Sequence, residues 1–230
     1  MGQHFLPGNP PVEITLRKTA QARRISLRIS RLDGRVTLTC PLRVSDREAL
    51  AFAQEKADWL RHHLTVQPAV AGVGIGHAVP FEGRMLRIAS GPGRLVRPEA
   101  EVLWVPGDPA RVAARLAGFM KQAARDRLAA ASDHYAARLG RGYARLSLRD
   151  TRSRWGSCTA DGWLMYSWRL VMAPPEVLSY VAAHEVAHLA EMNHSDAFWA
   201  VVTRLYGDYR APRRWLRDKG GDLHRYRFGD

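Results

Sequence analysis

The first forty residues alternate between apolar and polar positions with a period of two. The alternation covers residues 13–16, 24–29 and 35–39, and an Asp33-Gly34 turn signal precedes the last stretch. Alternation of this kind is typical of strands that place one face on a core. The pattern therefore predicts a small antiparallel sheet in this part of the chain.

Helical spacing of apolar residues follows, beginning at Ser45, which fits a capping box, and running to about Leu64. Glycine and proline are frequent over residues 66–107, where short apolar stretches indicate two more hairpins. A long helix over 108–139 begins with an acid followed by proline, which is a good helix start. The pattern predicts a β-rich N-terminal region over 1–107.

The second half of the chain, residues 108–230, mixes strand and helix patterns. Strands are predicted over 146–149, 152–158 and 163–168, and further helices over 174–192, 195–205 and 211–219. Together the two halves predict an α+β protein.

Composition narrows the class of protein. With 46% hydrophobic residues among 230, the chain can bury a substantial core. It has no apolar stretch long enough to span a membrane, and its N-terminus lacks the features of a signal peptide. We therefore expect a cytoplasmic protein without a membrane partner. Cys40 and Cys158 lie far apart in the sequence, which favours two free thiols in the core over a disulfide or a metal knuckle.

The net charge of +13 comes mostly from arginine. Guanidinium groups bind phosphate and carboxylate in a bidentate manner, so the surplus favours anionic partners. The arginines are spread along the chain, and a charge scattered over solvated faces is the alternative interpretation.

An H-E-x-x-H sequence occupies residues 184–188, inside the helix predicted over 174–192. Residues four apart lie above one another on a helix, so His184 and His188 can share one ion. Glu185 lies about 100° round the helix axis from His184, where it can take a proton from an activated water. The motif predicts one Zn²⁺ per chain, and a pair of buried histidines without an ion is the alternative.

Catalytic zinc sites have three protein ligands and one open position. Glu191, His194 and Asp196 are the candidates for the third ligand. Glu191 would approach from nearly the same side as the two histidines, and Asp196 suits the first turn of the next helix, where the dipole favours a carboxylate. His194 follows the expected end of the helix, where the chain can turn back, and is therefore the preferred ligand.

Several segments of the second half form a recognisable series. They are Arg154 to Cys158, Trp168-Arg169-Leu170, Ala173-Pro174, Tyr180-Val181 and the span from His184 to Trp199. This series resembles the YgjP-like metallopeptidase family, which is related to the SprT-like zinc proteases. The N-terminal stretch 24–29 and the Cys40-Pro41 bend are similar in kind.

The resemblance implies a zincin-like C-terminal domain over 108–230. It also implies metal ligands at His184, His188 and His194 and catalysis by Glu185. The sequence departs from the family pattern at Ser167, where asparagine is more frequent.

The strand over 152–158 is expected to border the cleft of such a site, where an extended peptide can pair with its edge. Trp155 suits a wall of this cleft, and Gly156 permits close backbone approach. Arg154 and Arg169 are candidates for binding an anionic group or the scissile oxygen. For both arginines, bracing the fold or pairing with an acid is the alternative.

The leading functional hypothesis is a zinc metallopeptidase that acts on a peptide or protein. One alternative is a metal-dependent phosphohydrolase acting on nucleotides or another phosphorylated substrate, which the arginine surplus favours and the lack of a glycine-rich phosphate loop opposes. The other is a DNA-associated SprT-like protein that acts on or binds at nucleic acid through an arginine-rich surface.

Overall fold

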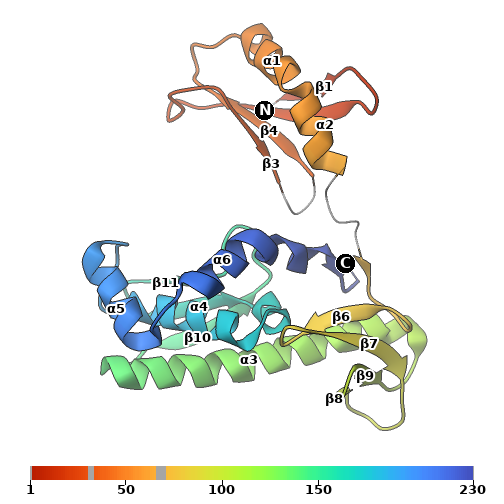
Figure 1. The fold of residues 1–230 in the computed structure, drawn as a ribbon, viewed down its shortest axis with the longest axis vertical. Helices are drawn as coiled ribbons and strands as arrows, with labels where there is room; N and C mark the ends of the chain where they lie inside the picture. The colour runs from red at the N-terminus through yellow and green to blue at the C-terminus, as the bar shows by residue number, and fades with distance from the viewer. Residues whose placement is uncertain (1, 31–33, 66–70, 230) are drawn as a thin grey trace. The chain divides into compact units, whose positions relative to one another are not determined.

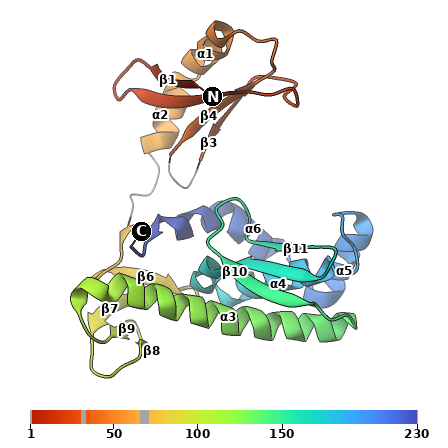
Figure 2. The same cartoon turned by 180° about the vertical axis from the view of Figure 1, so that it is seen from behind.

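The computed structural model describes residues 2–30, 34–65 and 71–229. The chain forms two compact units, Met1–Ala69 and Val70–Asp230, each with its own buried apolar cluster. Figures 1 and 2 show the two units from opposite sides.

The N-terminal unit contains a four-stranded sheet in the order β1-β2-β4-β3 and two helices. Its elements are β1 (Gly2–Leu6), β2 (Val12–Lys18), β3 (Ser26–Ile29), β4 (Val36–Cys40), α1 (Asp46–Glu55) and α2 (Ala57–Thr65). Ser45 caps α1 by accepting a hydrogen bond from the Glu48 N–H, as the capping-box pattern predicts. The helix expected to run from there to about Leu64 is divided in two at Lys56.

The prediction of an antiparallel N-terminal sheet is wrong for its central pair. β2 and β4 are parallel, with Ile14 opposite Val36, while β1 and β3 are antiparallel to their neighbours. The reason is strand order: β3 takes the edge, and β4 lies between β3 and β2. Alternation identifies which residues of a strand face the core, but it does not say which strand lies in the middle.

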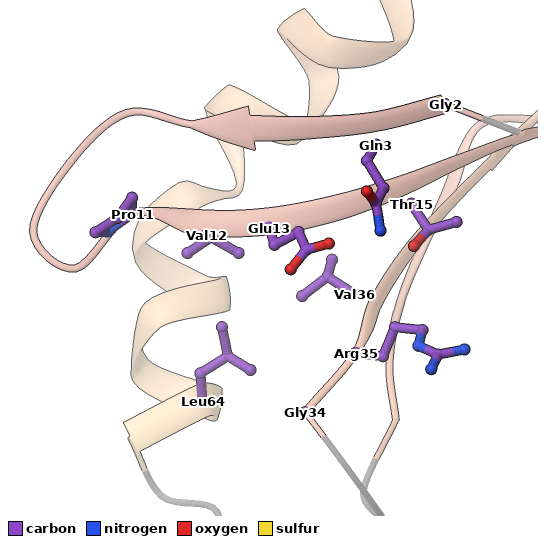
Figure 3. Close-up of a pocket in the computed structure, with 10 residues that line it drawn as sticks. All are labelled: Gly2, Gln3, Pro11, Val12, Glu13, Thr15, Gly34, Arg35, Val36 and Leu64. Carbon is purple, nitrogen blue, oxygen red and sulfur yellow. The ribbon is translucent and has the colours of Figure 1, made fainter.

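The core of this unit lies between the sheet and the two helices. Ile14 and Leu38 of the sheet and Leu60 of α2 are fully buried there. A hollow of about 760 Å³ opens beside this core, and Figure 3 shows Val12, Val36 and Leu64 around it. Its lining contains neither histidine nor cysteine among the described residues, so it offers no catalytic or metal-binding group of those kinds.

The second unit begins with a sheet built from two hairpins. Its strands, in the order β6-β7-β9-β8, are β6 (Ala78–Phe81), β7 (Arg84–Ser90), β9 (Val102–Val105) and β8 (Arg97–Glu99). Both hairpins predicted for this region are present, and β7 joins them by pairing in parallel with β9.

Because of this sheet, the second compact unit begins at Val70 and not after residue 107, where the sequence pattern predicts the boundary. Leu86 and Leu103 share one buried cluster with Leu116 and Met120 of the following helix. In addition, β5 (Ala71–Gly72) pairs with the strand at the end of the chain. Residues 71–105 therefore belong to the compact unit that also holds the H-E-x-x-H sequence.

A single long helix, α3 (Val112–Leu139), runs the length of the second unit (Figures 1 and 2). Asp108 accepts a hydrogen bond from the Ala110 N–H at 2.9 Å and caps the 3₁₀ turn η1 (Pro109–Arg111) that leads into it. Gly140 ends the helix in a left-handed conformation. The helix predicted over 108–139 is therefore confirmed.

The remaining elements pack against α3 and against one another. They are β10 (Arg145–Arg149), β11 (Gly156–Cys158), β12 (Trp163–Ser167), η2 (Trp168–Met172), α4 (Pro175–Ala187), α5 (Asp196–Tyr206), α6 (Arg210–Lys219), η3 (Gly220–Arg225) and β13 (Tyr226–Arg227). The sheet order is β10-β12-β11, with β10 parallel and β11 antiparallel to β12. Within the described ranges, no helix combines the length and the apolar character that crossing a bilayer requires.

Candidate metal centre and active site

The helix α4 carries the H-E-x-x-H residues into the interior of the second unit. Pro175 occupies its first turn, and most of its other residues are apolar, as expected of a helix that is covered on several sides. Its neighbours are α3, α5, α6 and β11. The helix ends at Ala187 and not near Met192 as the sequence pattern predicts, so the chain turns directly after the motif.

This early end of the helix fixes the ring of His188. His188 is the C-terminal cap of α4, and its Nδ1 lies 2.9 Å from the carbonyl oxygen of Glu191. A carbonyl oxygen only accepts hydrogen bonds, so Nδ1 carries the proton and the neutral ring presents an unprotonated Nε2. That tautomer has a free lone pair on Nε2 for a metal ion.

A short loop brings His194 back to the helix. Asn193 Oδ1 accepts a hydrogen bond from the Ser195 N–H, and Ser195 Oγ accepts one from the Phe198 N–H to cap α5. Between these two local anchors, His194 Nε2 lies 3.1 Å from His184 Nε2. The loop thus holds the third imidazole against the first.

The ligand atoms of His184, His188 and His194 all lie within 4.8 Å of one another. Two nitrogens bound to one tetrahedral zinc ion, each about 2.0–2.1 Å from it, lie about 3.4 Å apart. The closest pair here is similar, at 3.1 Å. The two other candidate ligands, Glu191 and Asp196, are outside this group among the described residues. Three histidines therefore converge on a place where a metal ion can be held.

The charge state of His184 and His188 suits a metal ion. Burial and the neighbouring His188 and His194 together lower the pKa of His184 to about 3. Burial also lowers the pKa of His188. Neutral imidazoles are the form that binds zinc. Phe198 is fully buried beneath the three rings, with its centroid 4.4–4.9 Å from theirs, so the site has a rigid apolar floor.

Glu185 follows His184 on α4 and faces β11, which contacts this helix. It is 5% exposed, and burial raises its pKa to about 8, against the opposing effect of the Arg154 charge. A Cβ atom added to Gly156 would lie only 2.5 Å from Glu185 Oε1 and 2.7 Å from its Cδ. The missing side chain of Gly156 is therefore what makes room for the Glu185 carboxylate.

Comparison with protein families places this geometry in context. The model of the YgjP-like metallopeptidase domain matches residues 23–219. The chain belongs to the YgjP-like metallopeptidase family. The match includes the three histidines and Glu185, and it extends through both compact units. It confirms the family that the sequence segments resemble.

Other comparisons add less. No curated protein matches the chain. Among solved structures, the crystal structure of the metallopeptidase zymogen abylysin of Pyrococcus abyssi is 21% identical and covers 42% of this chain and 95% of its own, with a TM-score of 0.34.

In this YgjP-like domain, two of the four residues expected to contact substrate lie near Glu185. Arg154 is exposed, and its charge acts on the Glu185 carboxyl. Gly156 begins β11 and touches Glu185, as described above. Trp155 is half-buried and packs on His224, with ring centroids 5.2 Å apart, and on Gly220 of η3.

Arg169 has a different place in the YgjP-like domain. It is 5% exposed, and its guanidinium binds Asp150 through two hydrogen bonds of 2.7 and 3.0 Å. The same group donates to the carbonyl oxygens of Leu223 and Tyr226. Arg169 thus takes the alternative role, in which an arginine pairs with an acid and braces the fold.

Cys158 and Ser167 were also named from the sequence. Cys158 is less buried than a core thiol, and the buried Ser167 hydroxyl has no hydrogen-bond partner among the described residues. Cys158 is close enough to Glu185 for its charge to act, while burial raises the thiol pKa to about 11. Neither side chain joins the histidine group.

Sequence reasoning missed Tyr209 and Arg213, which join Trp199 and Tyr180 in a cluster beside the histidines. Trp199 lies 5.7 Å from the His184 ring and stacks on Tyr209, and Tyr209 stacks on Tyr180. The guanidinium of Arg213 lies over the Trp199 ring, 4.7 Å from its centroid. Tyr209 and Arg213 are four residues apart at the start of α6, and this spacing was the signal that could have placed them on one face.

Proposed function

We propose that this YgjP-like protein is a zinc-dependent peptidase in which His184, His188 and His194 hold the ion and Glu185 moves the proton. The observation that carries the proposal is the convergence of three imidazoles beside a buried carboxyl group. Three histidine ligands leave an open position in a tetrahedral site, which is typical of catalytic zinc and not of structural zinc.

An ion held by these imidazoles supplies an electrophile for the substrate carbonyl and makes water more acidic. Glu185 accepts a proton from the attacking water as the oxygen bonds to the carbonyl carbon. It then donates that proton to the amine nitrogen as the carbon–nitrogen bond breaks. Burial raises the pKa of Glu185 to about 8 in the absence of an ion, and a cation held by the three imidazoles would lower this pKa and favour the carboxylate form that accepts the proton.

The edge of β11 is the proposed site for the substrate backbone. β11 pairs with β12 on one side only, and it contacts α4. An extended peptide that adds to this edge by main-chain hydrogen bonds passes beside Glu185. Arg154, Trp155 and Gly156 lie at or next to this edge, and Arg169 is left out because its hydrogen bonds hold the fold together.

The family match to metallopeptidases supports amide bonds as the substrate over phosphoesters. Within the described residues, the group that can hold a metal consists of histidines and contains no carboxylate. Magnesium beside phosphates is usually held by carboxylates. These observations favour the peptidase over the phosphohydrolase.

Metal content measured by elemental analysis tests the ligand set. We expect about one zinc per chain in the wild type and in a His134→Ala control, whose histidine is exposed and outside the group. The His194→Ala variant should lose most of the metal. A His194→Ala protein with a full complement of zinc would contradict the proposed third ligand.

Turnover of internally quenched peptides tests the role of Glu185. A Glu185→Gln variant should keep its zinc and lose activity by about 100-fold or more, because a general base contributes about 10²–10⁴-fold. An active, zinc-replete Glu185→Gln protein would refute the assignment of Glu185 as the base.

A further inference from the structure

The first turns of α6 place a positive charge on the flank of the metal centre. Tyr209 and Arg213 lie on the same face of the helix, which packs against α4. Arg213 rests on Trp199, with its guanidinium carbon 4.7 Å from the ring centroid. Trp199 in turn lies 5.7 Å from the ring of His184 and 5.9 Å from that of His194.

The electrostatic effect of Arg213 agrees with its position beside the histidines. Its positive charge acts to lower the pKa of His184, in the same direction as burial, and to lower the pKa of Tyr180, against the effect of burial. Two other arginines of α6, Arg210 and Arg217, pair with Asp208 and Asp218 at 2.9 Å. Among the described residues no carboxylate pairs with Arg213, so its charge is available to a ligand.

We infer that Arg213, supported by the face of Trp199, is a specificity-determining residue that binds a carboxylate of the substrate next to the bond being cleaved. The inference rests on the proposed peptidase function. It adds the substrate class, namely peptides with a carboxylate close to the scissile bond, from either an acidic side chain or the chain terminus.

The position of Arg213 favours a substrate carboxylate over the oxyanion of the reaction. Arg213 is exposed at the rim, whereas groups that stabilise an oxyanion act in a water-excluded site. Its guanidinium contacts Trp199, and no hydrogen bond joins it to any of the three histidines among the described residues. Successive residues of an extended peptide are about 3.3–3.6 Å apart. When the reacting carbonyl lies at the histidines, a carboxylate on a neighbouring residue can therefore lie near Trp199, whose ring is 5.7 Å from that of His184.

A guanidinium supported by an aromatic ring also suits this task, and that of Arg213 lies 4.7 Å from the Trp199 centroid. Contact with the ring face stabilises the cation, and N–H groups that do not face the ring can bind a carboxylate in a bidentate manner. Charge-assisted hydrogen bonds of this type correspond to about tenfold or more in affinity. We therefore expect Arg213 to act mainly on substrate binding, and thus on KM and not on kcat.

The test is peptide binding to zinc-loaded Glu185→Gln protein, measured by fluorescence anisotropy. The salt concentration is about 0.15 M, which is the physiological ionic strength. Three labelled peptides share one neutral sequence. The first has an amidated C-terminus, the second has glutamate at a central position and an amidated C-terminus, and the third has a free C-terminal carboxylate. Each is measured with Arg213→Gln and with a matched Arg214→Gln variant, since Arg214 is exposed on the same helix.

We expect at least one carboxylate peptide to bind about tenfold more tightly than the neutral one, and Arg213→Gln to abolish this preference while Arg214→Gln keeps it. The peptide that shows the preference identifies the source of the carboxylate. The inference is overturned if neither carboxylate peptide binds more tightly than the neutral one, or if the tighter binding survives in Arg213→Gln. It is also overturned if both variants lose the same amount of affinity, because equal losses indicate general charge attraction. Hydrolysis by the wild type is measured separately, so a failure of the peptidase proposal is distinguishable from a failure of this subsite.

Discussion

At Gly156 the backbone of β11 comes so close to Glu185 that no side chain fits between them. The glycine has an ordinary backbone conformation there, so the requirement is one of space and not of φ. Its first contact is the proposed proton carrier. A single methyl group at this position therefore meets the Glu185 side chain first.

A Gly156→Ala variant should lose about 100-fold in kcat/KM while keeping its zinc, because a displacement of about 1 Å in a reacting group costs on that order. A Gly142→Ala variant is the control, since nothing lies within 4 Å of a Cβ atom at that position. Peptide turnover and elemental analysis on both variants check this. Full activity in Gly156→Ala would show that Glu185 has another position to occupy.

The buried His224 should make folding sensitive to moderately acid pH. Its pKa is lowered to about 4 by burial and by the charge of Arg169, with Asp150 opposing and Arg152 and Arg227 adding to the effect. Between about pH 6.5 and pH 4 the unfolded chain binds a proton at this residue and the folded chain does not. Stability contributed by neutral His224 is therefore present above pH 6.5 and is lost as the pH falls toward 4.

Denaturant unfolding of metal-free wild type and His224→Gln between pH 7 and pH 4 measures this contribution. The free energy of unfolding should fall less steeply with pH in the variant. The other buried histidines titrate in both proteins, so the difference between the two slopes belongs to His224. Parallel slopes would show that His224 is protonated in the folded protein.

At the scale of elements, one side chain ties the C-terminal segment to η2, which precedes α4, and to the end of β10. Arg169 of η2 donates to carbonyl oxygens in η3 and β13 and pairs with Asp150 after β10. Three segments that are distant in sequence thus share one buried guanidinium. Asp150 shows the same coupling: burial acts to raise its pKa, but the hydrogen bonds and charge of Arg169 outweigh burial, so the pKa is lowered.

Replacing Arg169 with methionine should destabilise the second unit by about 3 kcal/mol, because it leaves buried carbonyls and a carboxylate without their partner. The surface pair Arg210–Asp208 is the control, and Arg210→Met should cost much less, because water screens an exposed ion pair. Chemical denaturation of both variants gives the comparison. Equal losses would mean that the Arg169 network contributes no more than a solvent-exposed ion pair.

At the scale of the whole molecule, the metal centre and its supporting core belong to one compact unit. All three histidines, Glu185, and the helices and sheets that pack around them lie within Val70–Asp230. The N-terminal unit has a separate apolar cluster. Folding of the second unit should therefore not require the first 69 residues.

A fragment spanning residues 71–230 should fold cooperatively and bind zinc with the stoichiometry of the full chain. Circular dichroism, thermal unfolding and elemental analysis check this. If the fragment folds and binds zinc but cleaves peptides more slowly than the full chain, the N-terminal unit contributes to substrate binding. A fragment that fails to fold would show that the second core depends on the first unit.

Several features of this protein followed from the sequence alone because they depend on local chemistry. The i, i+4 spacing of His184 and His188 in an apolar helix puts two imidazoles where they could share an ion, and helix caps such as Ser45 and Asp108 satisfy nearby backbone groups. Short-range turn signals likewise predicted the hairpins. The family resemblance rested on such segments, and the match over residues 23–219 confirms it.

Tertiary structure decided what depends on residues distant in sequence. The order of the N-terminal strands, the end of α4 at Ala187 and the pairing of Arg169 with Asp150 are set by packing partners that no local pattern names. The contact between Gly156 and Glu185 joins β11 to α4, two elements that are distant in the sequence. Periodicity determines which face of an element is buried, whereas the partner that covers that face is fixed only when the whole core assembles.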